Sequence, residues 1–259
     1  MDARSWRDAP EGDALADALP VDGSDGRHGW LLRMRWIDLL FAHWRVEPDL
    51  LEPVVPAPLQ LETFDGSAWL GVVPFLMRDT APRGVPAVPG VSAFAELNVR
   101  TYVTYLGRPG VLFLSLDAAN RLAVVAARTT AGLPYFHAEM SVEEGTGGWI
   151  DYRSSRRGTD GATFGGRYRS LVAPRPAPAG SLAAFLTVRD GLWTVDARGR
   201  AWWLAIRHPP WPLEHAEAAI DDVAVAAADG VPVSGPPDDL AFSRRVDVRA
   251  WRPVRYRPG

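Results

Sequence analysis

The chain contains no cysteine and no lysine. The absence of thiols excludes disulfides, thiolate metal ligands and a cysteine nucleophile. The absence of lysine leaves arginine as the only permanently charged basic side chain, and arginine stays protonated in proteins. A guanidinium cannot form an imine with a carbonyl compound. Two common kinds of covalent catalysis are therefore excluded before any fold is considered.

Long apolar runs are missing as well, because no stretch reaches the roughly 18 apolar residues that a membrane-spanning helix needs. The first residues, Met1–Asp8, lack the apolar core of a secretory signal. A formal net charge of -3 argues against the broad basic surface of a nucleic-acid-binding protein. We therefore expect a cytoplasmic protein that binds neither nucleic acid nor membranes.

Motifs for cofactors and metals are also absent. Gly161–Gly166 is rich in glycine but lacks the spacing and the strand-to-helix context of a dinucleotide-binding fingerprint. The sequence has no phosphate loop and no Gly-x-Ser-x-Gly elbow. A metal site needs three converging ligands, and no pair of histidines has helical spacing. We expect neither a cofactor nor a bound metal.

What the sequence does contain is frequent turns, marked by 24 glycines and 23 prolines. The most regular stretch is Phe94–Leu106, where side chains of different character alternate, as is typical of a half-buried strand. Gly107–Gly110 predicts a turn, and Val111–Asp117 predicts a second strand. Together they predict a hairpin.

The register of this hairpin gives a specific contact. If Leu106 pairs with Val111, Arg100 lies opposite Asp117 on one face. Opposite charges at facing positions of an antiparallel pair attract each other. We therefore predict an ion pair between Arg100 and Asp117. A bulge would instead move the two side chains to different faces of the sheet.

Residues 29–259 are expected to form one mainly β domain with a few short helices. Residues 1–28 are acidic and rich in Ala, Asp and Gly, which predicts a mobile tail. Caps and good helix formers predict the helices. Their expected positions are Pro48–Pro53, Asn120–Thr130, Ser181–Val188 and Glu214–Ala219.

Several separated motifs occur in an order that resembles a known family. The main stretches are Phe94–Val103, Gly110–Ala118, Gly132–Tyr135 and His208–Leu213, supported by His43-Trp44, Asp65-Gly66 and Val73–Phe75. Over roughly residues 30 to 255 the chain resembles the YqjF-like family, a domain of unknown function numbered 2071. The resemblance implies a fold like that of acetoacetate decarboxylase, with a double sheet or barrel around a small central pocket.

A weaker resemblance reaches acetoacetate decarboxylase itself. Val54–Leu59 is similar to a stretch of those enzymes, and Glu96 falls where their strand carries a pocket glutamate. Arg128 falls on an arginine in the helix before their catalytic turn. An N-terminal substrate-binding arginine of the decarboxylases aligns with Ile37, two residues from Arg35.

The resemblance breaks at the catalytic turn. The decarboxylases have Pro-Lys-Lys there, and one lysine forms a Schiff base because its neighbouring cation lowers its pKa. The present chain has Pro134, Tyr135 and Phe136 instead, with no lysine elsewhere. The resemblance therefore implies a pocket without Schiff-base chemistry.

Glu96 is a candidate general base, because a carboxylate in a closed apolar pocket has a raised pKa that a nearby arginine lowers again. Tyr135, at the lysine position by resemblance, can donate a hydrogen bond to a ligand oxygen. These two are the candidate catalytic residues. The candidate ligand-binding residues are Arg100, Tyr102, Arg128, His43, His137 and Phe136. Alternatively, the arginines form a structural ion-pair network with Asp117 and Asp38, and Tyr135 is an ordinary core residue.

Three functions remain open. The protein binds a compact ligand with a carbonyl or carboxylate group, without Schiff-base chemistry. Alternatively, it is an acid/base enzyme, resembling a lyase or isomerase, that uses Glu96 with Arg128 or Tyr135. In the third hypothesis it is a structural or oligomeric scaffold with a degenerate pocket. The small-molecule ligand is unidentified, and the sequence leaves the formation of a homo-oligomer open.

The lack of lysine gives a direct prediction. We expect no decarboxylation of acetoacetate and no covalent adduct when the protein is treated with borohydride and a ketone. The amine of Met1, with an ordinary pKa of about 8, is the only group that can form an imine. Mass spectrometry checks the result. An adduct mapped to any residue other than Met1 would overturn the exclusion of Schiff-base chemistry.

Overall fold

The computed structural model describes residues 29–88 and 91–256, so the N-terminal segment 1–28 lies outside the described residues. Within that part of the chain, no helix is long and apolar enough to cross a membrane. The strands are β1 (Leu32–Val46), β2 (Gln60–Leu61), β3 (Ala68–Pro82), β4 (Phe94–Tyr105), β5 (Arg108–Ala118), β6 (Tyr135–Glu144), β7 (Ile150–Arg156), β8 (Thr163–Ser170), β9 (Gly191–Val195), β10 (Ala201–Arg207), β11 (Glu214–Asp222), β12 (Asp239–Ala250) and β13 (Val254–Arg255). The helices are α1 (Pro48–Leu51), α2 (Arg121–Ala131), α3 (Leu182–Thr187) and α4 (Ala224–Ala228), with short 3-10 turns at Glu52–Val54 and Thr146–Gly148.

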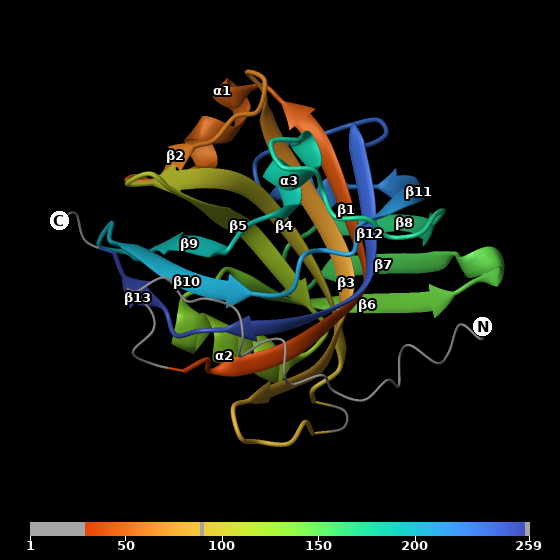
Figure 1. Ribbon diagram of the computed structural model, residues 1–259, viewed down its shortest axis with the longest axis horizontal. Helices are drawn as coiled ribbons and strands as arrows, with labels where there is room; N and C mark the ends of the chain where they lie inside the picture. The colour runs from red at the N-terminus through yellow and green to blue at the C-terminus, as the bar shows by residue number, and fades with distance from the viewer. Residues whose placement is uncertain (1–28, 89–90, 257–259) are drawn as a thin grey trace.

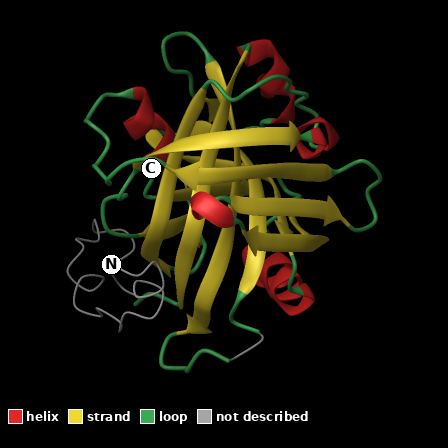
Figure 2. Cartoon of the chain, turned by 90° about the vertical axis from the view of Figure 1, so that its right-hand side faces the viewer, coloured by secondary structure: helices red, strands yellow, loops and turns green. Residues whose placement is uncertain are grey.

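Strand pairing closes two rings that share one wall (Figure 1). Ring A runs through β5, β6, β7, β8, β11, β12, β1, β3 and β4, and the β4–β5 pairing closes it. Ring B runs through β12, β1, β3, β4, β5, β9 and β10, and the β10–β12 pairing closes it. The shared wall is therefore β12, β1, β3, β4 and β5. In Figure 2 the strands on the near side cross those behind them at a steep angle.

Both faces of the shared wall are buried, which explains why β4 has buried side chains on each of its two faces. On β4, Leu97 and Val99 pack into an apolar cluster with Tyr152 of β7, inside ring A. Tyr102, on the other face of the same strand, packs with Phe75 in the cluster that fills ring B. The sequence predicted a half-buried strand with one solvated or pocket-lining face. In the structure, the polar face of β4 points into the interior of ring B.

The predicted register of the central hairpin is wrong. The turn contains only Leu106 and Gly107, whose φ angles of 50° and 75° are both positive. A two-residue type I′ hairpin turn requires positive φ at both of its central residues. Tyr105 therefore pairs with Arg108 rather than Leu106 with Val111.

A bulge then shifts the register between Val99 and Arg100. Arg100 lies opposite Phe113, and Asp117 lies opposite Leu97. Since facing residues share a side of the sheet, Arg100 points into ring B and Asp117 into ring A. The predicted Arg100–Asp117 ion pair is therefore not formed.

The helix predicted at Glu214–Ala219 is also wrong, because this segment belongs to strand β11. It pairs with β8 and, at its start, with β12. Its exposure alternates from residue to residue, the period of a strand rather than of a helix. The helix propensity of its alanines is overridden by pairing that closes ring A. A short helix, α4, follows instead at Ala224–Ala228.

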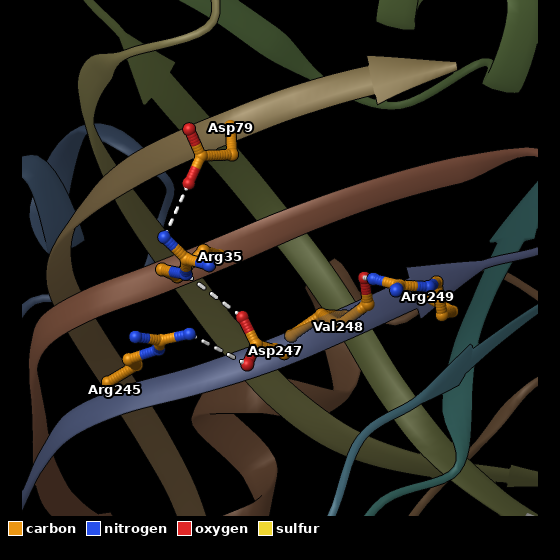
Figure 3. A network of polar contacts seen from close by, with 6 residues as sticks. All are labelled: Arg35, Asp79, Arg245, Asp247, Val248 and Arg249. Atoms are coloured by element: carbon orange, nitrogen blue, oxygen red, sulfur yellow. Dashed lines mark hydrogen bonds and ion pairs between the residues drawn. The ribbon is translucent and has the colours of Figure 1, made fainter. Parts of the chain in front are cut away.

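Charged side chains connect three strands of the shared wall (Figure 3). Arg35 of β1 contacts Asp79 of β3 through Nη1 at 2.5 Å and Asp247 of β12 through Nε at 3.0 Å. Arg245 adds a second contact to Asp247 at 3.2 Å. Arg35 is thus held by two carboxylates of the protein.

Because both faces of the shared wall are buried, its side chains should contribute strongly to the free energy of unfolding. Leu97→Ala should lower the free energy of unfolding by about 3 kcal/mol, because Leu97 is 0% exposed and its neighbours cannot fully close the cavity. Leu122→Ala is the matched control, since Leu122 of α2 is 68% exposed, and should change it by less than about 0.5 kcal/mol. Urea denaturation measures both. Equal effects would contradict the packing described for the wall.

Candidate functional site

The polar residues inside ring B come mainly from β4. Glu96, Asn98, Arg100 and Tyr102 alternate along one face of this strand and are all buried. His43, buried on the neighbouring part of the wall in β1, joins them. Burial of so many polar groups in one interior is costly unless each is hydrogen-bonded. Their hydrogen-bond partners therefore define what the interior can do.

At one end of this row, Tyr135 donates a hydrogen bond to Glu96 Oε2 at 3.0 Å. Gly132, with a φ of 63, ends α2 in the left-handed conformation and turns the chain into β6. Parallel pairing of Leu116 with Tyr135 then brings the phenol to Glu96. The two candidate catalytic residues, Tyr135 and Glu96, are thus in direct contact.

Burial raises the pKa of Glu96 from 4.5 to about 8. The hydrogen bond from Tyr135 opposes this rise, and the charge of Asp117 adds to it. Glu96 therefore keeps its proton near neutral pH. In this state it is a proton donor rather than the general base that the sequence suggested.

Asp117 belongs to a separate network inside ring A. Arg156 of β7 contacts Asp117 through Nε at 2.7 Å, Asp229 through Nη1 at 2.8 Å and Ser115 through Nη2 at 2.6 Å. Burial raises the pKa of Asp117 to about 6, although Arg156 opposes the rise. Asp117 thus has a structural ion pair, as the alternative hypothesis proposed, but its partner is Arg156. The alternating burial of β7, which places Arg156 on the same face as Tyr152, is the signal that could have identified this partner.

A second cluster in ring B surrounds the hydroxyl of Tyr102. This oxygen lies 2.7 Å from the carbonyl of Leu186 and 2.7 Å from His43 Nε2. A carbonyl only accepts, so Tyr102 donates to Leu186 and accepts from His43 Nε2. Nδ1 of His43 is then unprotonated, and it has no hydrogen-bond partner. Burial lowers the pKa of His43 to about 4, so this imidazole is neutral and Asp239, 3.8 Å away, does not form an ion pair with it.

Arg100 is the positive charge of ring B. Its Nη2 donates to the carbonyl of Leu186 at 3.0 Å, and its guanidinium lies 5.0 Å above the ring of Phe41. Nε of Arg100 and Oδ1 of Asn98 are buried without a hydrogen-bond partner. Among the residues that the structure describes, no carboxylate forms an ion pair with Arg100. Two other buried arginines, Arg35 and Arg156, have such partners.

The other sequence candidates lie outside these two clusters. Arg128 is exposed on α2, and no described hydrogen bond or ion pair joins it to Glu96 or Tyr135. Phe136 lies under the guanidinium of Arg156 at 4.3 Å, in the ring A network. His137 is half-buried on β6. The structure therefore brings together Arg100, Tyr102 and His43 in one cluster and Glu96 and Tyr135 in another.

Sequence analysis missed His208 as a member of the ring B interior. Its Nδ1 donates to the carbonyl of Pro209 at 2.7 Å, and its ring lies 4.6 Å from that of Trp211. Burial and the charge of Arg100 lower the pKa of His208, so Nε2 is available as an acceptor. The compact His-Pro-Pro-Trp stretch is the sequence signal that could have indicated this position.

A cavity of about 470 Å³ lies beside the Tyr102 cluster. It is lined by Leu106, Gly107, Arg108, Pro109, Val188, Arg189, Asp190 and Tyr256. The guanidinium of Arg189, on its wall, lies 5.0 Å above the ring of Tyr102. A second cavity of about 360 Å³ lies over β6, β7 and β8. Neither cavity is lined by Glu96 or Arg100.

These features define a protein of the acetoacetate decarboxylase-like fold class. The acetoacetate decarboxylase of Legionella pneumophila subsp. pneumophila str. Philadelphia 1 aligns with a TM-score of 0.60 and 12% identity, over 93% of this chain and 92% of its own. An acetoacetate decarboxylase-like enzyme from Sphingomonas wittichii RW1 aligns with a TM-score of 0.58 and 14% identity, over 90% and 95%. The enduracididine biosynthesis enzyme MppR, solved with pyruvate, aligns with a TM-score of 0.60 and 13% identity, over 95% and 98%. At these identities the likeness establishes the fold alone.

The chain belongs to the DUF2071 family, described as "Uncharacterized conserved protein (COG2071)", whose model matches residues 33–247. It is 43% identical over 226 residues to the "Uncharacterized protein YqjF" of Bacillus subtilis (strain 168), covering 87% of this chain and 92% of that relative. The family and the fold that the sequence motifs indicated are thereby confirmed.

The raised pKa of Glu96 predicts a pH dependence of stability. Between pH 4.5 and about 8 the folded protein keeps a proton that the unfolded chain releases, so the free energy of unfolding falls as pH rises through this window. Glu96→Gln mimics the protonated side chain and still accepts from Tyr135. We expect it to be more stable than wild type at pH 8 and to lose Glu96's share of the slope, up to about 1.4 kcal/mol for each pH unit.

Urea denaturation at a series of pH values measures this difference. Glu143→Gln, at an exposed position on β6, is the matched control and should follow the wild-type profile. Asp117 contributes a slope of the same sign in all three proteins, so the comparison isolates Glu96. Parallel profiles for wild type and Glu96→Gln would show that Glu96 is ionised when buried.

Proposed function

We propose that this protein binds a compact organic anion, with a carboxylate and a carbonyl or hydroxyl group, in the interior of ring B. Arg100 is the counterion in this proposal. The observation that carries it is a buried guanidinium for which no residue in the described part of the chain supplies a carboxylate partner. An uncompensated buried charge costs several kcal/mol, and a ligand carboxylate would remove most of this cost through charge-assisted hydrogen bonds.

Two other arginines show what the fold does with buried cations. Arg35 and Arg156 are 8% and 5% exposed, and each holds two aspartates. Arg100 is also 8% exposed, yet its guanidinium contacts a carbonyl and aromatic rings. The stability of the fold alone does not favour a buried guanidinium in such surroundings, whereas the binding of an anion does.

Asn98 is the member of the polar row that a compact ligand held by Arg100 can reach. Side chains two residues apart on a strand lie about 6.6 Å apart, so Glu96 lies roughly 13 Å from Arg100, with Asn98 between them. The unpaired Oδ1 of Asn98 can accept from a ligand hydroxyl. His208 and His43, both neutral, offer further hydrogen bonds without adding charge that would compete with Arg100.

The second candidate function is acid/base catalysis on a ligand held by Glu96 and Tyr135 instead, because these groups lie too far from Arg100 for one compact ligand to reach both. The observation that favours it is the protonated Glu96 bonded to Tyr135, which can deliver a proton to a carbonyl oxygen. Arg128 has no part in this version, because its side chain is exposed on α2. No side chain can form an imine with this ligand, since the chain has no lysine.

Calorimetric titration with pyruvate, acetate and acetoacetate tests the proposal. Pyruvate is chosen because MppR, a relative in fold, was solved with it. Wild type should bind at least one of these anions, and Arg100→Gln should weaken binding at least tenfold. Arg128→Gln is the matched control, since it removes an exposed arginine, and should leave the affinity unchanged.

The ligand-free Arg100→Gln variant provides a second measurement. Because it removes an uncompensated buried charge, its thermal midpoint should be equal to or higher than that of wild type. A lower midpoint together with unchanged anion binding would contradict the proposed function. Failure of wild type to bind any of the three anions would favour the scaffold hypothesis.

A further inference from the structure

The C-terminal end of α3 is held by side chains of ring B. The carbonyl of Leu186 accepts from Arg100 Nη2 at 3.0 Å and from the Tyr102 hydroxyl at 2.7 Å. The next carbonyl, of Thr187, accepts from Trp211 Nε1 at 2.8 Å. Three donors of the ring B interior thus converge on two consecutive backbone oxygens.

These oxygens belong to a helix terminus and carry partial negative charge, because the last carbonyls of a helix have no partner within it. They offer Arg100 the same chemistry as a ligand carboxylate, but more weakly, since a backbone carbonyl at a helix terminus carries only partial negative charge and a carboxylate carries a full charge. The end of α3 therefore occupies donors that would suit an anion better.

The segment that follows is held by two ion pairs, one to Glu62 in the loop after β2 and one between Asp190 Oδ2 and Arg207 Nη1 of β10 at 2.8 Å. Arg189 Nη1 lies 2.6 Å from Glu62 Oε2, and Arg189 Nε donates to the carbonyl of Phe185 at 2.9 Å. Val188, between these contacts, is exposed and lines the cavity of about 470 Å³. Residues 182–190 form a strap that lies between this cavity and Arg100.

The strap has little structure of its own. Helix α3 contains six residues, and residues 171–180, which precede Ser181, are exposed almost throughout. Segments with few buried contacts open locally at a lower free energy than the whole protein. A hinge in residues 171–180 would let the strap move without unfolding either ring.

We propose that the strap is a movable cover of a carboxylate subsite made by Arg100, Tyr102 and Trp211, and that an entering carboxylate displaces the strap carbonyls from these donors. Entry follows release of the Glu62–Arg189 ion pair, through the cavity beside Val188. The identity of the ligand as a carboxylate rests on the proposed function. The opening of the strap in the ligand-free protein is independent of the proposed function.

The absence of cysteine makes the opening measurable by thiol labelling. Leu186 of the strap and Leu97 of the shared wall are both fully buried, so Leu186→Cys and Leu97→Cys are matched variants with one thiol each. With a soluble thiol reagent, the thiol of Leu186→Cys should react at least about 100-fold faster than that of Leu97→Cys, because it needs only local opening. Equal protection of the two thiols would overturn the proposal.

The role of the Glu62–Arg189 ion pair is tested in the Leu186→Cys background. Adding Glu62→Gln should speed labelling about fivefold, because it removes the carboxylate that holds Arg189. Glu217→Gln is the control, since it removes a comparable pair, Glu217–Arg169 at 2.7 Å on β11, and should not change the rate. An unchanged labelling rate with Glu62→Gln would overturn the role of the Glu62–Arg189 ion pair in holding the strap closed.

Pyruvate separates this proposal from the proposed function. If saturating pyruvate binds, labelling of Leu186→Cys should become faster, because the anion replaces the strap carbonyls at Arg100. Slower labelling with bound pyruvate would overturn displacement. If no anion binds, and the ligand-free rates still follow the expected order, the proposed function fails while the movable strap is supported.

Discussion

The structure depends on the burial of one wall from both sides. Because β12, β1, β3, β4 and β5 belong to two closed rings, each strand of the wall sends alternate side chains into two different interiors. A strand such as β4 cannot expose its polar face to water. Its polar residues are instead buried, and each needs a partner supplied by another part of the fold.

The two interiors meet this requirement in different ways. In ring A, Arg156 is surrounded by Asp117, Asp229 and Ser115, so its charges are compensated within the protein. In ring B, Arg100 contacts backbone oxygen and aromatic faces. Ring A is thus a packed structural core with an internal ion-pair network. In the described part of ring B, Arg100 Nε, Asn98 Oδ1 and His43 Nδ1 are buried without a hydrogen-bond partner.

The acetoacetate decarboxylase-like fold is retained here with a changed chemical centre. A phenol, Tyr135, which the sequence resemblance aligns with the lysine of the decarboxylases, is hydrogen-bonded to Glu96. Burial keeps Glu96 protonated near neutral pH. This pair can bind or protonate an oxygen, but it cannot form an imine. The fold therefore sets the place of the site, and the side chains at that place decide its chemistry.

Sequence by itself determined the features that depend on local pattern or on composition. The alternation of Phe94–Leu106 predicted β4, Asn120 and Gly132 cap α2 where the sequence placed a helix, and the lack of lysine excluded Schiff-base chemistry. Tertiary structure decided the hairpin register, the strand β11 and every partner of the buried charges. Arg156 and Asp229 are 73 residues apart, and Arg100 and Leu186 are 86 apart. Such pairs form only when ring closure brings distant strands together, and no local pattern encodes that closure.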